Sequence, residues 1–352
     1  MLDDGGYGFS VRWDRAEHGF CQHQKMWLID AGEKTETAFV GGINLNPNTM
    51  ASPGHGGPNE HHDIYVELSG PSAVDVHHNF VQRWNEASER LAQDGQWGPS
   101  AESDLLFPEK VPVRTGRSTV QIQRTMHRGR YRNDQAAPGA NSFAVAEGEQ
   151  TIFDQYCSAI EAAQSAIYIE NQYLEAREIV DELRRAVKRG IEVVLVVPAR
   201  PDFPEDLTKS PEKISFWDQR ADLARYHNFT FAGLAGLGTD GHRQPFYVHA
   251  KTMLIDDAWA TIGSCNLHRA SLFGNGELNV AISDADFVRA VRTELFQEHL
   301  AKDTSGMDAR SALRLFATVA RENRNRLNRN NPNWQGLAFT LDLASYGRQS
   351  QM

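Results

Sequence analysis

An eight-residue motif occurs twice in this chain and constrains its fold more than any other feature. The copies read HQKMWLID, from His23 to Asp30, and HAKTMLID, from His249 to Asp256, and five of the eight positions are identical. Each copy continues into a short apolar strand and a turn of small residues that ends in asparagine, AFVGGIN and ATIGSCN. This internal repeat indicates one structural unit that is used twice.

The similarity between the copies extends well past the motif. Asp63 precedes the alternating stretch IYVELSG, and Glu277 precedes LNVAI, so we predict a strand headed by an acidic residue in each copy. A helix should then begin at Pro71 in the first copy and cover DFVRAVRTELFQEHL in the second.

The region before the second motif predicts a further strand-helix-strand unit. After a helix over 150–164, AIYIE is expected as a strand, AREIVDELRRAVKR as a helix ended by Gly190, and IEVVLVVP as a strand buried on both faces. Only 22 residues precede His23, so we expect the first unit to be truncated at its N-terminus. We predict an α/β protein with these parts: a first unit over 1–140, a second over 141–302, and a C-terminal helix and tail over 303–352 that pack on the core.

Composition excludes some functions. The net charge of −10 argues against binding nucleic acid by phosphate neutralisation.

The three cysteines, Cys21, Cys157 and Cys265, cannot all pair and lack metal-ligand spacing. We expect Cys21 and Cys265 to be buried, inert thiols. Neither a membrane span nor the basic and apolar regions of a signal peptide is evident. We expect a cytoplasmic or peripheral membrane location, and export with free thiols stays open.

The repeated histidine and lysine suit phosphodiester chemistry, which needs a nucleophile, a proton donor and cations around the phosphate oxygens. One histidine of the pair His23 and His249 would attack phosphorus as a neutral imidazole while the other protonates the leaving oxygen. Water activated by the second histidine would then release the phosphohistidine, and an alcohol in place of water would give transphosphatidylation. This scheme needs no metal or other cofactor.

Further residues should support the two histidines. Asp63 and Glu277 are candidate acceptors for the second ring nitrogen of each histidine. Lys25 and Lys251 should bind phosphate oxygens from the same strand face as their histidines. The candidate substrate-binding residues of the two turns are Asn44, Asn266, Gly42 and Ser264. The last residues of the motifs are Asp30 and Asp256. We expect them on the opposite strand face, with a structural role in which they pair with a buried cation or with backbone donors.

Other histidines carry less weight. The stretch GHGGPNEHHD, with His55, His61 and His62, is interpreted as a glycine-rich loop with solvated side chains and not as a metal site. His77 and His78 are expected on the surface of the first predicted helix.

From about residue 20 to residue 300, these features resemble the phospholipase D superfamily. HHDIYVELSGPSAVDVHHNFVQRWN is similar to the family's segment after the first motif, IYIENQYL to the strand before the second, and YVHAKTMLIDD with IGSCNL to the second motif itself. The resemblance implies a pseudo-twofold α-β-α sandwich with the site at the seam between the halves. It also implies His23 as the nucleophile, supported by Glu277, and His249 as the general acid and base, supported by Asp63. Many phospholipases carry aspartate where this chain has Glu277.

The function so implied is hydrolysis of glycerophospholipids to phosphatidic acid and a head-group alcohol, by a monomer that acts at a membrane surface. Phosphatidyl transfer, as in cardiolipin or phosphatidylserine synthesis, uses the same chemistry with an alcohol acceptor. A nuclease is disfavoured by the acidic composition. A non-catalytic lipid-binding derivative remains compatible with the short first unit.

Overall fold

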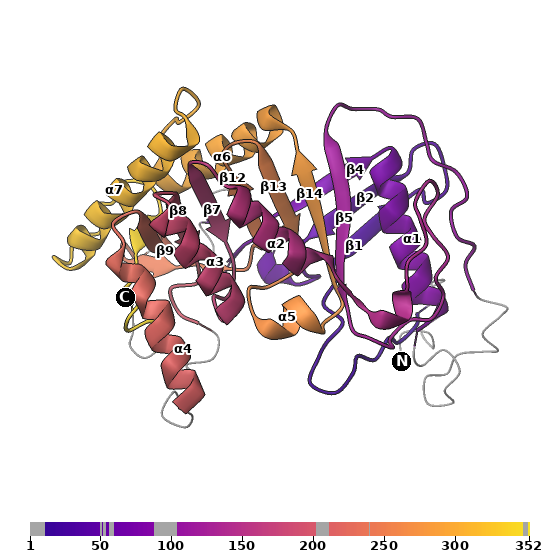
Figure 1. The fold of residues 1–352 in the computed structure, drawn as a ribbon. Coiled ribbons are helices and arrows are strands. Elements are labelled where there is room, and N and C mark those ends of the chain that lie inside the picture. Colours follow the sequence, from indigo (N-terminus) through magenta and orange to yellow (C-terminus); the bar gives the residue numbers. More distant parts are fainter. Residues whose placement is uncertain are drawn as a thin grey trace.

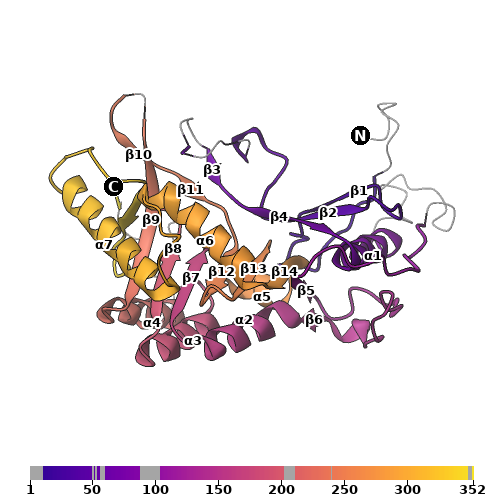
Figure 2. The same ribbon diagram turned by 90° about the horizontal axis from the view of Figure 1, so that it is seen from above.

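The computed structural model describes residues 11–49, 51, 54–55, 60–87, 104–201, 211–238, 240–347 and 351–352. Strands in these ranges form one large mixed sheet, a small three-stranded sheet and a short two-stranded ladder, with helices packed around them (Figures 1 and 2). The predicted α/β class is confirmed.

The large sheet has the strand order β10-β9-β8-β7-β12-β13-β14-β5-β6, and β15 also pairs with β9. Strands β7, β8 and β9 are parallel, whereas β12, β13, β14 and β5 pair antiparallel. Every residue of β7 and β8 is buried, as expected for strands covered on both faces. The bounds are β5 Thr119–Met126, β6 Glu149–Gln150, β7 Ala166–Glu170, β8 Glu192–Val196, β9 Phe229–Leu237, β10 Arg243–Pro245, β12 Thr252–Ile255, β13 Trp259–Gly263, β14 Glu277–Ser283 and β15 Ala338–Thr340.

Two layers of helices sandwich this sheet (Figure 2). Helices α2 and α3 pack on one face through one apolar core, and α6 and α7 pack on the other face through a second core. Asp284 caps α6 by accepting hydrogen bonds from the amides of Asp286 and Phe287, and Asp308 caps α7 by accepting from the amide of Ser311. The helices are α2 Thr151–Ala162, α3 Arg177–Lys188, α4 Pro211–Ala221, α5 Arg269–Phe273, α6 Ala285–Leu300 and α7 Ala309–Leu327, with 3-10 turns at Pro47–Thr49, Val145–Glu147 and Asp222–Arg225.

The first unit is built mainly from the small sheet and helix α1 (Pro71–Asn85). The small sheet has the order β1 (Met26–Ile29), β2 (Thr37–Gly41) and β4 (Tyr65–Ser69). Its inner face shares an apolar core with α1 and with strands β13 and β14 of the large sheet. The seam between the two units is therefore a packed core, which holds the ends of the neighbouring strands in fixed positions.

Two features differ from the sequence expectation. The motif histidines and lysines precede the regular strands, because β1 begins at Met26 and β12 at Thr252. Strand β5 lies before residue 140, yet it pairs with β14 along its length, so the first part of the chain completes the sheet of the second. The division of the chain near residue 140 stays a proposal.

The C-terminal tail packs against the large sheet. Trp334, Phe339 and Tyr346 are buried in the same core as α2 and α3, and β15 extends the sheet beside β9. Among the described residues, no helix combines the length and the apolar character that a transmembrane span requires.

Candidate active site

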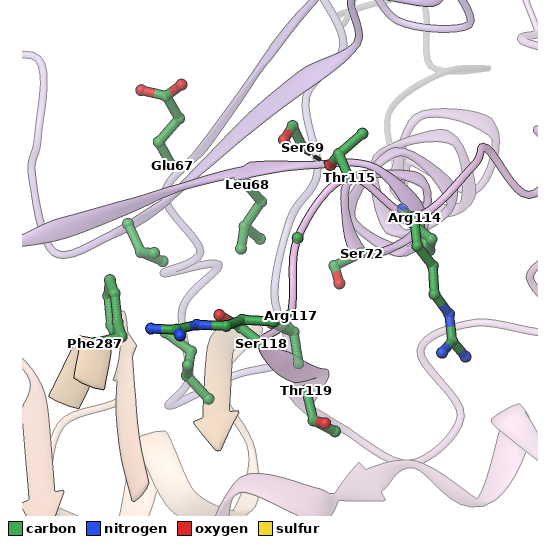
Figure 3. A pocket seen from close by; sticks show the side chains of 15 residues that line it. Glu67, Leu68, Ser69, Ser72, Arg114, Thr115, Arg117, Ser118, Thr119 and Phe287 are labelled. Atoms are coloured by element: carbon green, nitrogen blue, oxygen red, sulfur yellow. Dashed lines mark hydrogen bonds between the residues drawn. The ribbon is translucent and has the colours of Figure 1, made fainter. Parts of the chain in front are cut away.

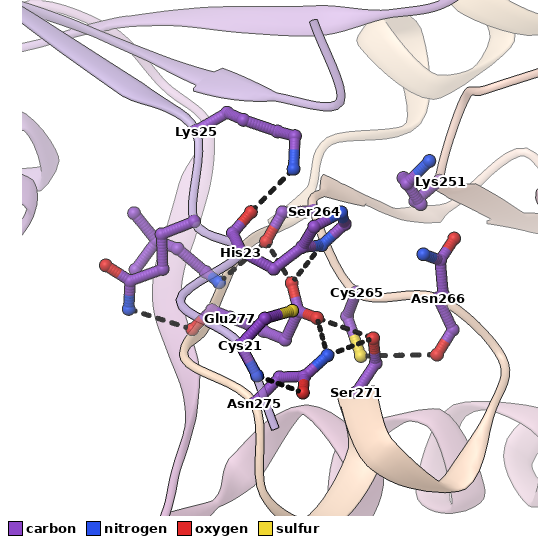
Figure 4. A network of polar contacts seen from close by, with 12 residues as sticks. Cys21, His23, Lys25, Lys251, Ser264, Cys265, Asn266, Ser271, Asn275 and Glu277 are labelled. Carbon is purple, nitrogen blue, oxygen red and sulfur yellow. Dashed lines mark hydrogen bonds and ion pairs between the residues drawn. The ribbon is translucent and has the colours of Figure 1, made fainter. Parts of the chain in front are cut away.

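The first motif histidine is anchored to the second unit. The amide of His23 donates to the carbonyl of Gly276 at 2.8 Å, and the amide of Gly276 donates to the carbonyl of Cys21 at 2.9 Å. Gly276 directly precedes Glu277, whose Oε2 lies 2.9 Å from Nδ1 of His23 (Figure 4). The backbone pairing therefore places the Glu277 carboxylate of the second unit beside the His23 imidazole of the first.

The second motif histidine is anchored to the first unit by the same arrangement. Strand β3 (His61–His62) runs parallel to β11 (Tyr247–Val248), and the amide of His249 donates to the carbonyl of His62 at 2.8 Å. The next residue, Asp63, places Oδ2 2.7 Å from Nδ1 of His249. Both crosswise pairs that the resemblance implied are thus present, and each leaves Nε2 as the ring nitrogen not held by the carboxylate.

Glu277 is fully buried and is held by several donors. Ser264 Oγ donates to its Oε2 at 2.6 Å, and the Ser271 hydroxyl and the Asn275 amide donate to its Oε1. Burial alone would raise the pKa of Glu277, but the hydrogen bond and charge of His23, with the two serine hydroxyls, hold it below its usual value. The carboxylate stays ionised and can stabilise an imidazolium at His23.

The turn residues Gly42 and Ser264 contact these carboxylates, and their role as substrate ligands stays a prediction. The Ser264 hydroxyl is used by Glu277 and also accepts from the amide of Leu278. Gly42 occupies the corresponding place in the first unit, and a Cβ there would lie 2.2 Å from Oδ1 of Asp63. Glycine therefore makes room for the shorter Asp63, whereas serine donates to the longer Glu277.

The two lysines lie beside the histidines. Lys25 Nζ donates to the carbonyl of His23 at 2.8 Å, and Lys251 Nζ donates to the carbonyl of His249 and, at 3.1 Å, to Oε1 of Gln172. Burial lowers the pKa of Lys25 to about 8, against the opposing effect of Glu277 and other nearby acids. Gln172 was not predicted as a site residue, although it lies in the IYIENQYL segment that resembles the family.

The site therefore favours an anion. Burial is the main cause that lowers the pKa of His249 to about 4, and repulsion from Lys251 and Lys25 lowers it further, although Asp63 opposes the shift. A bound phosphodiester would place negative charge beside these cations and raise the pKa of His249 again.

The two asparagines of the repeat do not occupy equivalent places. Asn266 is buried beside Lys251 (Figure 4), and its Oδ1 has no hydrogen-bond partner among the described residues. Asn44 is exposed, and its carbonyl accepts a hydrogen bond from Thr49. Of the two, the structure brings only Asn266 to the other site residues.

The aspartates of the motifs lie at the far ends of their strands. Asp256 accepts hydrogen bonds from the amides of Gln164, Ser165 and Ala166 at 2.7–2.8 Å, which ties the start of β7 to the end of β12. Asp30 is exposed and accepts from the Thr35 hydroxyl at 2.8 Å. Asp256 thus accepts from backbone donors as its spacing predicted, whereas Asp30 accepts from an exposed threonine hydroxyl, and neither lies with the histidines.

Three predictions about other residues were wrong. His55 and His62 are buried, 6% and 4% exposed, because His62 pairs with Glu170 from the second unit. His78 is also buried, with Nε2 2.7 Å from the carbonyl of Gln135. Cys21 is exposed, whereas Cys265 is buried as expected.

A separate pocket of about 440 Å³ is shown in Figure 3. It is lined by Val66–Ser69, which make up most of β4, by Ile282 near the end of β14 and by Arg114 and Arg117. Glu277 lies at the opposite end of β14, and Asp63 precedes β4. No predicted site residue lines this pocket.

Comparison with protein families identifies two regions of the chain. Residues 44–177 match the family model described as phospholipase D, and residues 156–300 match the model described as cardiolipin synthase, PLD-like domain. The two matches, together with the equivalent contacts of the two motifs, are consistent with a duplicated arrangement.

Related proteins come from plants and bacteria. Phospholipase D gamma 3 of Arabidopsis thaliana is 23% identical over 79% of this chain and 46% of its own length. Cardiolipin synthase A of Pseudomonas putida (strain W619) is 26% identical over 84% of this chain and 52% of its own length. The chain thus spans about half the length of the curated relatives it matches. A solved structure of a phospholipase D family member, Nuc from Salmonella typhimurium, aligns with 55% of this chain and 98% of that protein, at 18% identity and a TM-score of 0.34.

Proposed function

Because this chain belongs to the phospholipase D superfamily, we propose that it is a phosphodiesterase that hydrolyses glycerophospholipids to phosphatidic acid and a head-group alcohol. The observation that carries the proposal is the pair of crosswise contacts, His23 with Glu277 at 2.9 Å and His249 with Asp63 at 2.7 Å. Each imidazole is oriented by the other unit, so neither unit would be competent alone.

The first step forms a phosphohistidine. Nε2 of His23 attacks phosphorus, and the bond from phosphorus to the head-group oxygen breaks as His249 gives that oxygen a proton from its Nε2. Glu277 stabilises the positive charge that develops on the attacking ring. Lys25 and Lys251 supply the cations for the non-bridging oxygens.

The second step regenerates the enzyme. His249, now neutral, takes a proton from water, the water oxygen attacks phosphorus, and the bond between phosphorus and Nε2 of His23 breaks. Asp63 then stabilises the imidazolium that His249 becomes. Because the proposed substrate is a membrane lipid, we also propose that the protein works in peripheral contact with a bilayer. The further proposal that it acts as a monomer is independent of the substrate.

The test is release of choline from phosphatidylcholine in mixed micelles, with and without ethanol. Choline release that His23→Ala and His249→Ala each abolish supports the proposal, and phosphatidylethanol in the ethanol sample shows that an alcohol can replace water. A folded protein that turns over no phosphodiester would refute it and favour a lipid-binding derivative.

Phosphatidyl transfer to an alcohol acceptor is a second candidate. It is favoured by the match of residues 156–300 to the cardiolipin synthase model, which includes His249 and Glu277. Incubation with phosphatidylglycerol separates the two activities. Cardiolipin and free glycerol are the products of transfer, whereas phosphatidic acid and glycerol are the products of hydrolysis.

A further inference from the structure

A second group of titratable side chains lies buried directly behind His249. His62 and Glu170 are 4% and 0% exposed, and Nε2 of His62 lies 2.9 Å from Oε2 of Glu170. The Tyr168 hydroxyl donates to Oε1 of Glu170 at 2.7 Å. On the other side of the ring, Nδ1 of His62 lies 3.1 Å from Nε2 of His55. The mechanism above uses none of these groups.

The contacts describe an ion pair. Both nitrogens of His62 face an acceptor, which suits an imidazolium that donates from each side. Burial by itself would lower the pKa of His62, but the charge and hydrogen bond of Glu170 outweigh it and raise the pKa to about 9. For Glu170, burial would raise the pKa, and the same pairing lowers it to about 2.

A metal site is the competing interpretation, because ligand atoms lie within 4.8 Å of one another in two groups that both include His62: one with Glu170 and His299, the other with His55 and Glu298. The contacts favour the ion pair instead. The nitrogen and oxygen that a metal would need on His62 and Glu170 already bind each other, and the second oxygen of Glu170 accepts from Tyr168.

His62 joins this ion pair to the reacting histidine. Its carbonyl accepts from the amides of His249 at 2.8 Å and Ala250 at 3.1 Å, and the residue after it, Asp63, binds Nδ1 of His249. Glu170 ends β7 and is the register partner of Thr252, which follows Lys251. The ion pair thus ties β3 of the first unit to β7 of the second at the level of the motif.

We infer that the buried His62–Glu170 ion pair is a positioning element that aims His249 at the leaving-group oxygen. The inference rests on the proposed function and extends it beyond the residues that touch substrate. The pair fixes the His62 carbonyl and Asp63, and these two groups fix the backbone and the ring of His249. Its loss should impair proton transfer and leave phosphate binding to the lysines unchanged.

The leaving group makes this testable. Choline leaves as an alkoxide that needs a proton, whereas p-nitrophenolate is stable without one, so misaligned proton donation slows only the first reaction. We expect Glu170→Gln, which keeps the shape and removes the charge, to lower kcat for phosphatidylcholine about 30-fold, with KM unchanged. The pre-steady-state burst of p-nitrophenolate from phosphatidyl-p-nitrophenol should change less than about 3-fold.

Two further variants separate positioning from general damage. Tyr168→Phe keeps the buried ring and removes one hydrogen bond to Glu170, so it should show the same selectivity to a smaller degree. Asp257→Asn breaks another buried ion pair, with Arg292 at 2.7 Å, at the opposite end of β12. This matched control should lower the melting temperature and affect both substrates equally.

The outcomes are distinguishable. A wild-type protein that turns over neither substrate refutes the proposed function, and the inference with it. An active wild type whose Glu170→Gln and Tyr168→Phe variants lose equal activity on both substrates overturns the inference alone. A transition metal that copurifies in a one-to-one ratio and is lost in His62→Gln would also overturn it, because those atoms would then be ligands.

Discussion

The sharpest structural prediction concerns Gly42, which lies against the carboxylate that supports His249. A Cβ at this position would be 2.2 Å from Oδ1 of Asp63, whereas ordinary contacts of a Cβ begin at 3.4 Å. In Gly42→Ala the carboxylate must therefore move by roughly 1 Å. Its hydrogen bond to Nδ1 of His249, now 2.7 Å, would lengthen beyond the range in which such bonds stabilise.

The cost follows from the kind of bond that is lost. A hydrogen bond to a charged group contributes about 1.5–3 kcal/mol, which corresponds to a fall in kcat of roughly 10-fold to 100-fold if it is needed in the transition state. KM should change little, because phosphate contacts come from the lysines. The assay is steady-state choline release, with circular dichroism to confirm that the variant is folded.

A matched control is Gly306→Ala, because an added Cβ there meets nothing within 4 Å. It should leave both activity and melting temperature unchanged. If Gly42→Ala retained full kcat, Asp63 would not be the group that orients His249, and the crosswise assignment of the carboxylates would be wrong.

Three other perturbations follow from the same contacts. Ser264→Ala removes the 2.6 Å hydrogen bond to buried Glu277 and should lower kcat about 10-fold with little change in KM; an unchanged kcat would show that the serine is dispensable. Asp256→Ala leaves three backbone amides without their acceptor, so we expect a loss of about 3 kcal/mol in the free energy of unfolding by urea titration, whereas full stability would contradict its structural role. Lys25, with a pKa of about 8, is protonated below that pH, so the decline of kcat/KM that deprotonation of His249 causes should become steeper as the pH rises through 8. Lys25→Arg should remove this steepening, because arginine stays charged; if the steepening persisted in Lys25→Arg, another group would be its cause.

The sequence predicted which residues meet at the candidate site better than it predicted the surroundings of those residues. The repeat selected His23, His249, Asp63 and Glu277, because each copy carries a motif histidine and, further along the chain, an acidic residue that heads a strand. The helices over 71–85 and 285–300 also followed from periodicity. The order of residues in each copy and the periodicity of each helix depend on short sequence distances, and a sequence shows these directly.

The errors concern contacts between distant residues. His62 looked like a solvated loop residue because its partner, Glu170, lies 108 positions away in the chain. Asn44 and Asn266 looked equivalent, yet Asn44 is exposed while Asn266 is buried. The contacts of Gly42 with Asp63 and of Ser264 with Glu277 were not predicted either, because the carboxylates are brought there only by folding.

The pseudo-symmetry of the two units is also incomplete. Met253 and Ile255 of β12 are buried, whereas the corresponding Trp27 and Ile29 of β1 are 45% and 53% exposed. The motif alone gives no sign of this, because its apolar positions are filled in both copies.

The most direct measurement locates the covalent intermediate. The protein would be mixed with phosphatidyl-p-nitrophenol, denatured in alkali to preserve the phosphorus–nitrogen bond, and digested for mass spectrometry. We predict a phosphatidyl group on His23 in the wild type, its accumulation on His23 in His249→Ala, and none in His23→Ala. Label on His249, or equal labelling of His23 with and without His249, would contradict the claim that the two units share one active site.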